Sequence, residues 1–477
     1  MKQTLIYLTI FCLFTLESMA QITFVKHYGE SSGQGNSLIV NSNGNYVIAG
    51  RKGGQPGIDQ FCTYELNING DTIWLKKYGT DSMEQANQII QTIDGGYASI
   101  GFSAGYLSNY RNIYLVKTNI LGDTSWTKKI GGQGHENGTA IAQLNTGEYI
   151  IGGTTDFNSN GLFDFYLVKT DITGDTIWTR KYGGSQNEES NSMRRTFDGG
   201  YILSGYTESY SNGMKDFYLV KTDSIGDTLW TKNYGGGLDD VSLSVRQTSD
   251  SGFVLSGYSE SFGISTENMY VIKTNSVGDT LWTRTFGQPT RYSWGEDIIQ
   301  TSDGGYAITG LIKTASPNGG FDFYLVRLDA FGILQWEREI KVEPTNTSFT
   351  SSVGRSILQT LDGGFAIAGR WFSAISYELL FIKTDSSGTV GIDEMKNPES
   401  FKVFPNPFNE STTILLKEIG ANYNLNLYNS QGKIVFTSSN ISSGEYQINR
   451  NNLPSGLYLI QLATNKGLMV TQKVIIE

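Results

Sequence analysis

The apolar residues of this chain fall in short runs that are separated by turns rich in Gly, Asp and Asn. In the run at 216–222, DFYLVKT, Phe217 and Leu219 point to one face of an extended strand, and Tyr218 and Val220 point to the other. Neither face is polar, so both must be covered by protein. Small sheets stacked face to face satisfy this requirement. A helical solenoid would need a 3.6-residue period, which is absent.

The runs recur as a unit whose copies are marked by a tryptophan. Each unit contains four runs that resemble VRQTSD, GYVLSGY, FYLVKTD and LWTKxYGG, in that order. Four short β-rich runs separated by turns predict an antiparallel meander, the blade of a β-propeller. The repeated tryptophan is best explained by burial between blades. The spacings are 52, 52, 52, 52 and 54 residues, between Trp74, Trp126, Trp178, Trp230, Trp282 and Trp336.

The four runs do not occur equally often, and the difference predicts how the ring closes. The first three runs occur seven times, but the tryptophan run occurs six times. Its seventh copy is FVKHYG at 24–29, with Phe24 at the tryptophan position. We therefore predict an all-β fold: a seven-bladed β-propeller over residues 21–390, closed by the N-terminal strand, with Val25 beside Ile382. A closed ring has no exposed sheet edges.

The N-terminus and the composition limit the compartment and the partners. Residues 1–20 combine one Lys, an apolar run and a small-x-small ending, which predicts a secretory signal peptide. No later segment approaches the length of a membrane span. Cleavage would remove Cys12 and leave Cys62 without a disulfide partner. The net charge of -10 argues against nucleic acid and favours cations or neutral ligands.

The repeated sequence pattern ends near residue 390. We expect a linker at 391–400 and then, at 401–477, a small Ig-like β-sandwich built from alternating strands. Three groups of residues stand out in this segment: the Pro405-Asn406-Pro407 turn, the YNSQGK segment that contains Gly432, and the LPSGLY segment. The last of these contains Gly456 and Tyr458, and it is followed by a terminal strand that begins at Lys473.

These motifs, in this order, resemble the type A C-terminal sorting domain of the type IX secretion system in Bacteroidetes. The resemblance implies transit through the periplasm, interaction with the type IX machinery, and then secretion or retention at the outer cell surface. It covers the last sixth of the chain. The repeats resemble uncharacterised secreted proteins and imply no activity.

The strand order divides the predicted ring into two faces. The short DGG and GDT turns share one face, and the longer loops share the other, where binding residues usually lie. Aromatic residues in those loops could stack on a sugar or a peptide, or could anchor the loops. They are Tyr106, Tyr110, Tyr210, Trp294 and Trp371.

An acid also recurs on that face, ten residues after four successive tryptophans, at Glu84, Glu136, Glu188 and Asp240. These carboxylates could hold a cation such as calcium near the channel, or each could accept hydrogen bonds within its own loop. The mature chain holds two histidines, His27 and His135, and no nucleotide-binding glycine loop that opens a helix. No cofactor other than calcium is indicated.

Two functions follow from these features. The first is a monomeric binding module for an extracellular glycan or protein. The alternative is a secreted carbohydrate-active hydrolase or lyase that uses the carboxylates of the long-loop face, which would require two of them at a defined separation.

Overall fold

A computed structural model describes most of the chain: residues 22–28, 33–55, 58–79, 83–104, 110–159, 161–264, 267–315, 319–342, 350–373, 377–390, 401–416, 423–429, 433–441, 444–464 and 469–477. The expected signal peptide and the expected linker lie outside these residues. The chain divides into two compact units, Met1–Gly391 and Ile392–Glu477. Each unit is described by itself below.

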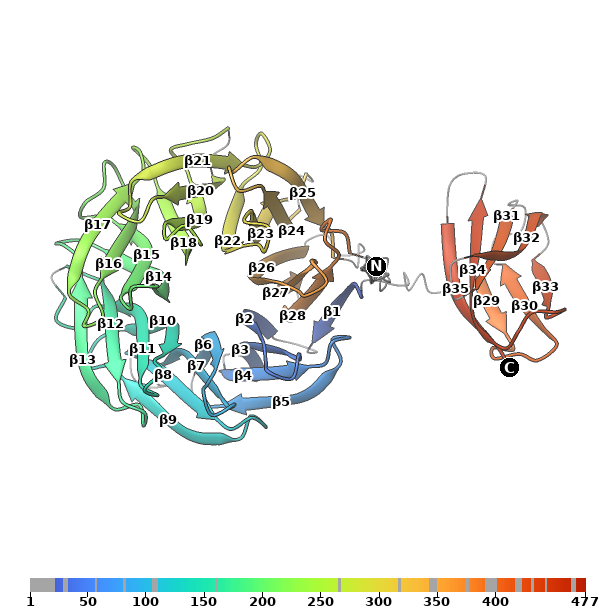
Figure 1. The fold of residues 1–477 in the computed structure, drawn as a ribbon, viewed down its shortest axis with the longest axis horizontal. Helices are drawn as coiled ribbons and strands as arrows, with labels where there is room; N and C mark the ends of the chain where they lie inside the picture. The colour runs from blue at the N-terminus through green and yellow to red at the C-terminus, as the bar shows by residue number, and fades with distance from the viewer. Residues whose placement is uncertain are drawn as a thin grey trace, which may run out of the picture. The chain divides into compact units, whose positions relative to one another are not determined.

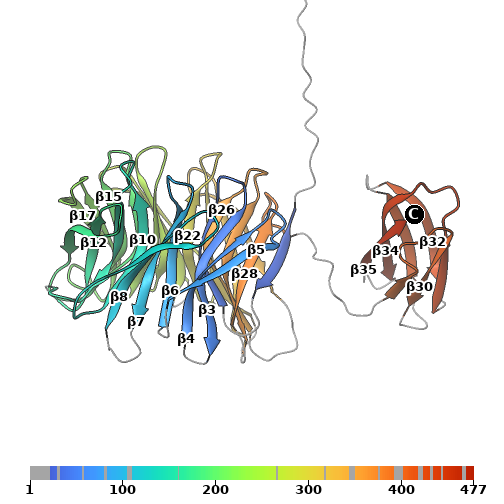
Figure 2. The same cartoon turned by 90° about the horizontal axis from the view of Figure 1, so that it is seen from below.

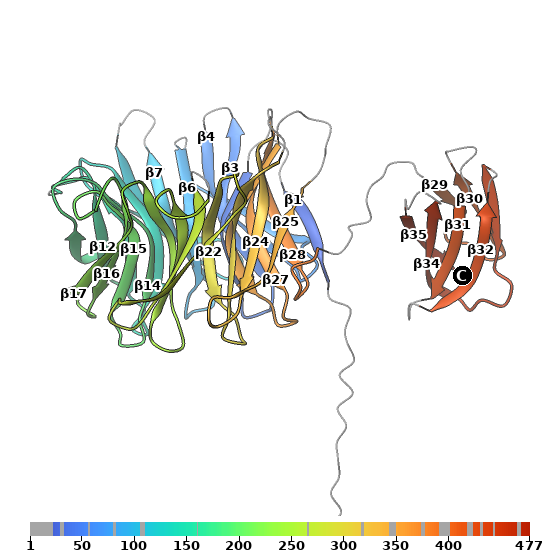
Figure 3. The same cartoon turned by 90° about the horizontal axis from the view of Figure 1, so that it is seen from above.

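The described part of the N-terminal unit consists of seven four-stranded antiparallel sheets. The sheets are arranged in a ring (Figure 1), and their strands run between its two faces (Figures 2 and 3). The prediction of an all-β fold built from repeated four-stranded sheets is confirmed. In each sheet that is formed by consecutive strands, the first strand lies nearest the centre of the ring, and the fourth strand, which carries the tryptophan, lies outermost.

Six sheets are formed by consecutive strands. The first contains β2 (Gly33–Val40), β3 (Tyr46–Gln55), β4 (Ile58–Leu66) and β5 (Thr72–Tyr78). The second contains β6 (Met83–Gln91), β7 (Tyr97–Ala104), β8 (Arg111–Thr118) and β9 (Thr124–Ile130). The third contains β10 (Glu136–Gln143), β11 (Tyr149–Thr155), β12 (Asp164–Thr170) and β13 (Thr176–Tyr182).

The next three sheets repeat this order. They contain β14 (Glu188–Arg195), β15 (Tyr201–Thr207), β16 (Asp216–Thr222) and β17 (Thr228–Tyr234); then β18 (Asp240–Gln247), β19 (Phe253–Ser259), β20 (Asn268–Thr274) and β21 (Thr280–Phe286); then β22 (Ser293–Gln300), β23 (Tyr306–Lys313), β24 (Phe321–Leu328) and β25 (Leu334–Ile340).

The remaining sheet combines the two ends of the unit. Its order is β1-β28-β27-β26, with β1 (Phe24–Tyr28), β26 (Thr350–Gln359), β27 (Phe365–Ser373) and β28 (Tyr377–Thr384). Strand β1 is antiparallel to β28, with Val25 opposite Ile382 and Phe24 opposite Lys383. The pairing that the phase of the repeat predicts is therefore present.

Neighbouring sheets are joined by an aromatic ring that lies on a glycine. The ring comes from the outermost strand of one sheet, and the glycine from the turn that follows the third strand of the next. A Cβ built on Gly122 would lie 2.8 Å from Trp74, and one on Gly70 would lie 2.8 Å from Phe24. The other pairs are Trp126 with Gly174, Trp178 with Gly226, Trp230 with Gly278, Trp282 with Gly332 and Trp336 with Gly388.

The same turns bind two further groups of the preceding sheet. Lys76 Nζ lies 2.8 Å from Asp123 Oδ1, and Tyr78 Oη donates a 2.8 Å hydrogen bond to the Gly122 carbonyl. The recurrent GDT and W-x-K-x-Y motifs are thus the two sides of one junction. The repeated lysine of the third strand has a different role, because Lys117 pairs with Asp94 of its own sheet at 2.8 Å.

The C-terminal unit has a three-stranded and a four-stranded sheet, with orders β29-β30-β33 and β32-β31-β34-β35. Both contribute to one apolar core, which includes Val403 and Ile414 of the first sheet and Leu427 and Ile460 of the second. The strands are β29 (Phe401–Phe404), β30 (Ser411–Leu416), β31 (Tyr423–Asn429), β32 (Ile434–Ile441), β33 (Glu445–Asn449), β34 (Gly456–Thr464) and β35 (Met469–Ile476).

The motif residues of this unit hold its terminal strand in place. Between Pro405 and Pro407, the Asn406 side chain donates a 3.0 Å hydrogen bond to the Lys473 carbonyl and accepts a 2.8 Å bond from the Ile475 N–H. Tyr458 is buried and donates to the Pro454 carbonyl. Gly456 begins β34 with a φ of 155°. Gly432 lies outside the described residues.

The closing strand makes the first prediction. Phe24 is 5% exposed and its ring centroid lies 5.4 Å from that of Phe381. Phe24→Ala should therefore lower the unfolding free energy of the N-terminal unit by about 3–5 kcal/mol. Calorimetry of the secreted chain measures this change. Lys26→Ala is the control, because its exposed ion pair with Asp71 is worth at most about 1 kcal/mol. Equal melting temperatures for the two variants would contradict closure by β1.

Candidate functional site

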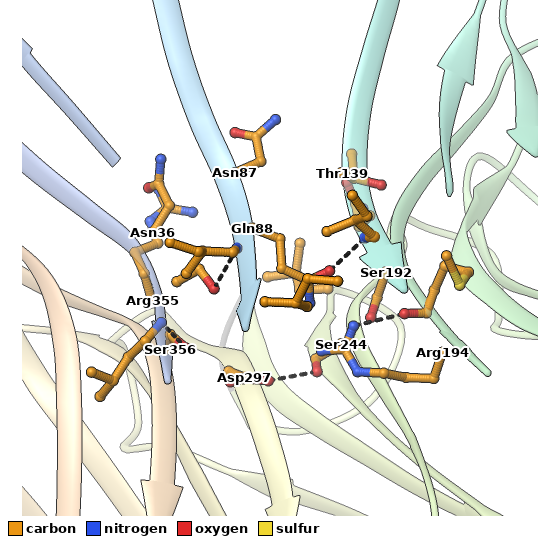
Figure 4. A pocket seen from close by; sticks show the side chains of 18 of the residues that line it. Asn36, Asn87, Gln88, Thr139, Ser192, Arg194, Ser244, Asp297, Arg355 and Ser356 are labelled. Carbon is orange, nitrogen blue, oxygen red and sulfur yellow. Dashed lines mark hydrogen bonds between the residues drawn. The ribbon is translucent and has the colours of Figure 1, made fainter. Parts of the chain in front are cut away.

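A cavity of about 410 Å³ lies inside the ring and is lined by residues of the first strand of every sheet. Figure 4 shows these side chains converging from neighbouring strands. The arrangement follows from the order of the strands in each sheet, because the first strand of each meander lies nearest the centre of the ring.

Each of these first strands contains a β-bulge at the same place. In β2 the register shifts between Gly35 and Ser37, and in β6 it shifts between Ala86 and Gln88. A bulge adds one residue to one strand and re-aims its side chain. All seven extra residues line the cavity, and they are Asn36, Asn87, Thr139, Asn191, Leu243, Glu296 and Arg355.

The residue after the bulge links one sheet to the next. The backbone N–H of Ile89 donates to Ser37 Oγ at 3.2 Å, and that of Ile141 donates to Gln88 Oε1 at 2.6 Å. The Leu38 N–H donates to Ser356 Oγ at 3.1 Å and so ties the first complete sheet to the composite sheet. The cavity wall is therefore also a belt of hydrogen bonds between sheets.

The charges in this wall are unevenly paired. Arg355 Nη1 lies 2.8 Å from Glu296 Oε2, and Arg246 Nη2 lies 2.8 Å from Asp297 Oδ1. Arg194 also lines the cavity, and its guanidinium donates to the carbonyl of Met193 at 2.7 Å. Among the described residues no carboxylate forms an ion pair with Arg194. Burial and the charge of Arg355 also lower the pKa of nearby Arg370.

The aromatic residues that the sequence singled out do not form one site. Trp371 is only 7% exposed and packs in the core of the composite sheet. Trp294 is partly buried and stacks on Tyr258 at 4.7 Å, with its indole N–H bonded to Glu267. Tyr110 is 43% exposed beside His135, and Tyr210 is 49% exposed. Tyr106 lies outside the described residues.

Tyr210 is one of three equivalent exposed aromatic residues that the sequence analysis did not recognise as a group. Phe157, Tyr210 and Phe262 come from the loop between the second and third strands of three adjacent sheets, and we call them the aromatic arc. They are 39%, 49% and 40% exposed. The inner face of each ring lies on the second glycine of a GG pair, since a Cβ there would lie 3.1, 3.2 and 3.5 Å from the ring at Gly132, Gly184 and Gly236.

The four recurrent acids are buried and are not gathered into a metal site. Glu188 accepts hydrogen bonds from the Gly184 N–H at 2.7 Å and from Thr207 Oγ1 at 2.6 Å, and Glu136 accepts equivalent bonds. Glu84 and Asp240 are likewise at most 1% exposed. Glu84 accepts a bond from Ser103 Oγ of its own sheet, and Asp240 accepts one from the Gly236 N–H of the preceding loop. Among the described residues, no three His, Cys, Asp or Glu side chains form a group that could hold a metal ion.

Two of these acids, Asp240 and Glu188, each lie close to a second carboxylate. A Cβ on Gly235 would lie 2.1 Å from Asp216 Oδ1 and 2.8 Å from Asp240 Oδ2, and Gly183 is placed in the same way between Asp164 and Glu188. Both Asp216 and Asp240 are fully buried. Burial and then the Asp240 charge raise the pKa of Asp216 above its usual value, against the hydrogen bonds that it accepts.

The remaining reactive side chains are occupied or inaccessible. His27 Nδ1 lies 2.8 Å from Glu378 Oε2. Cys62 is a free cysteine, and burial raises the pKa of its thiol to about 12. A thiol with that pKa does not supply a nucleophile at neutral pH.

Sequence reasoning missed the cavity wall entirely. Three of the seven bulge residues are Asn and the other four are all different, so residue type does not mark them as a set. The available signal was their constant position, four residues before the end of the first strand. The aromatic arc was detectable, because a GG pair recurs after the tryptophan run and its second glycine leaves space for a later aromatic residue.

Comparison with known proteins places the C-terminal unit in a family. Residues 402–477 match the secretion system C-terminal sorting domain. No curated protein matches the chain. The match confirms the resemblance stated from the motifs, and it indicates type IX export to the outer cell surface or secretion. The described residues include no helix long and apolar enough to cross a membrane.

The solved structures similar to the chain include propellers of low identity. The extracellular domain of a putative hybrid two-component system from B. thetaiotaomicron has 12% identity and a TM-score of 0.43 over 93% of this chain, which spans 57% of that protein. The β-propeller domain of the Trilobed protease from Pyrococcus furiosus has 11% identity and a TM-score of 0.40, with 79% and 99% coverage. The α-L-arabinanase of Penicillium chrysogenum has 10% identity and a TM-score of 0.39, with 77% and 97% coverage.

A ring of repeated four-stranded sheets followed by this tail defines an exported β-propeller protein. Residues 402–477 belong to the secretion system C-terminal sorting domain family.

The buried acid pair makes the second prediction. A raised folded-state pKa means that stability falls as pH rises from the ordinary value of about 3.9 through the folded pKa. Asp216→Asn removes the charge and keeps a carbonyl oxygen for the Asn212 N–H. It should raise the melting temperature at neutral pH, and the gain should shrink in acid. The exposed control Asp227→Asn should give no gain. A lower melting temperature for Asp216→Asn at neutral pH would contradict the repulsion.

Proposed function

We propose that this protein is an exported binding module that recognises an extracellular glycan or protein through the long-loop face of its propeller. The observation that carries the proposal is the aromatic arc. Its three rings hold equivalent positions on adjacent sheets, and each is packed against a glycine and 39–49% exposed. Aromatic faces held in this way stack on sugars and on apolar or cationic side chains.

The scaffold of the proposal is a seven-bladed propeller over residues 21–390, closed by the N-terminal strand. The seven four-stranded sheets and the pairing of β1 with β28 support it. We also propose that residues 401–477 form an Ig-like sandwich, because their two sheets share one apolar core. Residues 1–20 would be the signal peptide and 391–400 the linker.

The surroundings of the arc favour a neutral or apolar partner. Leu162, Met214 and Ile264 lie in the same three loops and are 66%, 57% and 66% exposed. An extended partner could cross the three sheets and meet one ring on each. The hydrolase alternative gains no support, because Glu136 and Glu188 are at most 1% exposed and hydrogen-bonded within their own sheets.

The third prediction tests the arc. The triple variant Phe157→Ala, Tyr210→Ala and Phe262→Ala should lose about tenfold or more in affinity for the partner, because each aromatic contact contributes about 0.5–1.5 kcal/mol. The secreted chain is screened on glycan and protein arrays, and the affinity of each hit is then measured for both proteins. A polymer should bind more tightly than its monomer, because only the polymer reaches all three rings.

The control uses the opposite face. Phe197 and Phe331 stand at short turns and are 71% and 73% exposed. The variant Phe197→Ala and Phe331→Ala removes comparable aromatic area and should bind as the unaltered chain does. Loss of binding in this control, with retention in the triple variant, would move the binding surface to the short-turn face. The absence of any ligand on either array would refute recognition by this face.

The fourth prediction concerns export. Removal of residues 401–477 should leave the protein in the periplasm, because the segment that engages the secretion machinery is lost. Fractionation of cells and medium measures this outcome. Leu361→Ser, at an exposed turn of the N-terminal unit, should not alter export. Normal export of the truncated chain would refute a sorting role for this tail.

A further inference from the structure

The cavity inside the ring has an apolar sector and a cationic sector. The residues three positions after the bulge show this division. In three consecutive sheets they are Ile39, Ile90 and Ala142, and in the next two they are Arg194 and Arg246; all five line the cavity. A molecule inside the ring would therefore meet hydrocarbon on one side and guanidinium groups on the other.

The two arginines occupy equivalent positions but differ in their partners. Arg246 faces Asp297 of the next sheet, and the two form an ion pair at 2.8 Å. The residue that corresponds to Asp297 one sheet earlier is Ser244, so Arg194 faces a hydroxyl where Arg246 faces a carboxylate. Figure 4 shows Ser244 bonded to Asp297, with Arg194 on the same side of the cavity.

The carboxylates of the wall cannot neutralise Arg194. Asp297 already accepts hydrogen bonds from Arg246, Ser244 and the Ile357 N–H. Glu296 is paired with Arg355. The cavity lining contains no other Asp or Glu among the described residues. Its charge is therefore a net positive one, although the chain carries -10 overall.

We infer that this cavity binds a small organic carboxylate, with the carboxylate on Arg194 and an apolar body against Ile39 and Ile90. A guanidinium presents paired N–H donors that match the two oxygens of a carboxylate, and such charge-assisted bonds are the strong ones. A volume of about 410 Å³ is within the usual range for small-molecule sites. The site is separate from the aromatic arc and does not depend on the proposed function.

Titration of the secreted full-length chain with acid and amide pairs tests the inference. Hexanoate and benzoate, followed by ligand-observed NMR, should bind at least tenfold more tightly than hexanamide and benzamide, because only the acids can accept the guanidinium bonds. Glucuronate and inorganic phosphate, which lack an apolar body, should bind more weakly than either acid.

The variants locate the site. Arg194→Gln should reduce affinity for the two acids at least tenfold and leave the amides within twofold. Arg194→Lys keeps the positive charge but loses the paired N–H donors of the guanidinium. Its affinity for the two acids should lie between that of the unaltered chain and that of Arg194→Gln. The matched control is Arg111→Gln, since Arg111 is exposed and does not line the cavity. It removes the same charge from the chain and should change affinity less than threefold.

Four results would overturn the inference. They are equal affinity for acids and amides, equal losses in Arg194→Gln and Arg111→Gln, glucuronate or phosphate binding as tightly as hexanoate, and no carboxylate binding at millimolar concentration. Melting temperatures of all variants are measured in parallel. If Arg194→Gln does not fold, then Arg194→Lys and the acid and amide pairs on the unaltered chain decide the outcome.

Discussion

The ring depends on one contact, an aromatic side chain that lies on a glycine of the next sheet. The glycine is required twice over. At Gly122 the φ is 75°, where a side chain is strained, and a Cβ would lie 2.8 Å from Trp74. The contact recurs at seven junctions, with Phe24 replacing tryptophan where the chain begins its first strand. Each contact packs one sheet against the next and so contributes to the stability of this unit.

This contact lies at the outer edge of the ring. The cavity at its centre is shaped by the first strand of each sheet. Seven first strands meet around a small circle, and each bends at a bulge. The residue after the bulge hydrogen-bonds to the next sheet, as Ser37 does with the Ile89 N–H. Arg194 stands out in this wall because Ser244 occupies the position that corresponds to Asp297, the ion-pair partner of Arg246.

The sequence predicted features that every repeat shares. The period, the order of the strands and the role of Phe24 follow from counting, because each copy confirms the others. Features that belong to one blade were not predictable. Trp371 was predicted to be a loop aromatic, yet it lies within β27 and is buried. Glu188, one of the recurrent acids, follows the alternative that the sequence left open, because it accepts hydrogen bonds from the Gly184 N–H and the Thr207 hydroxyl. Whether a polar group has a partner depends on contacts between segments distant in sequence.

The net charge of -10 does not describe the charge of the cavity wall. It suggested cations or neutral ligands, yet the cavity wall holds more arginines than carboxylates. Many of the acids lie in turns, as Asp123 and Asp175 do, and form ion pairs with a lysine of the preceding sheet. Exposed charges are screened beyond about 8–10 Å in physiological salt, whereas a lined cavity focuses the field of its own groups. The charge that a small ligand meets inside the ring is thus set by the few side chains around it, and the sum over the chain describes solubility and long-range encounter.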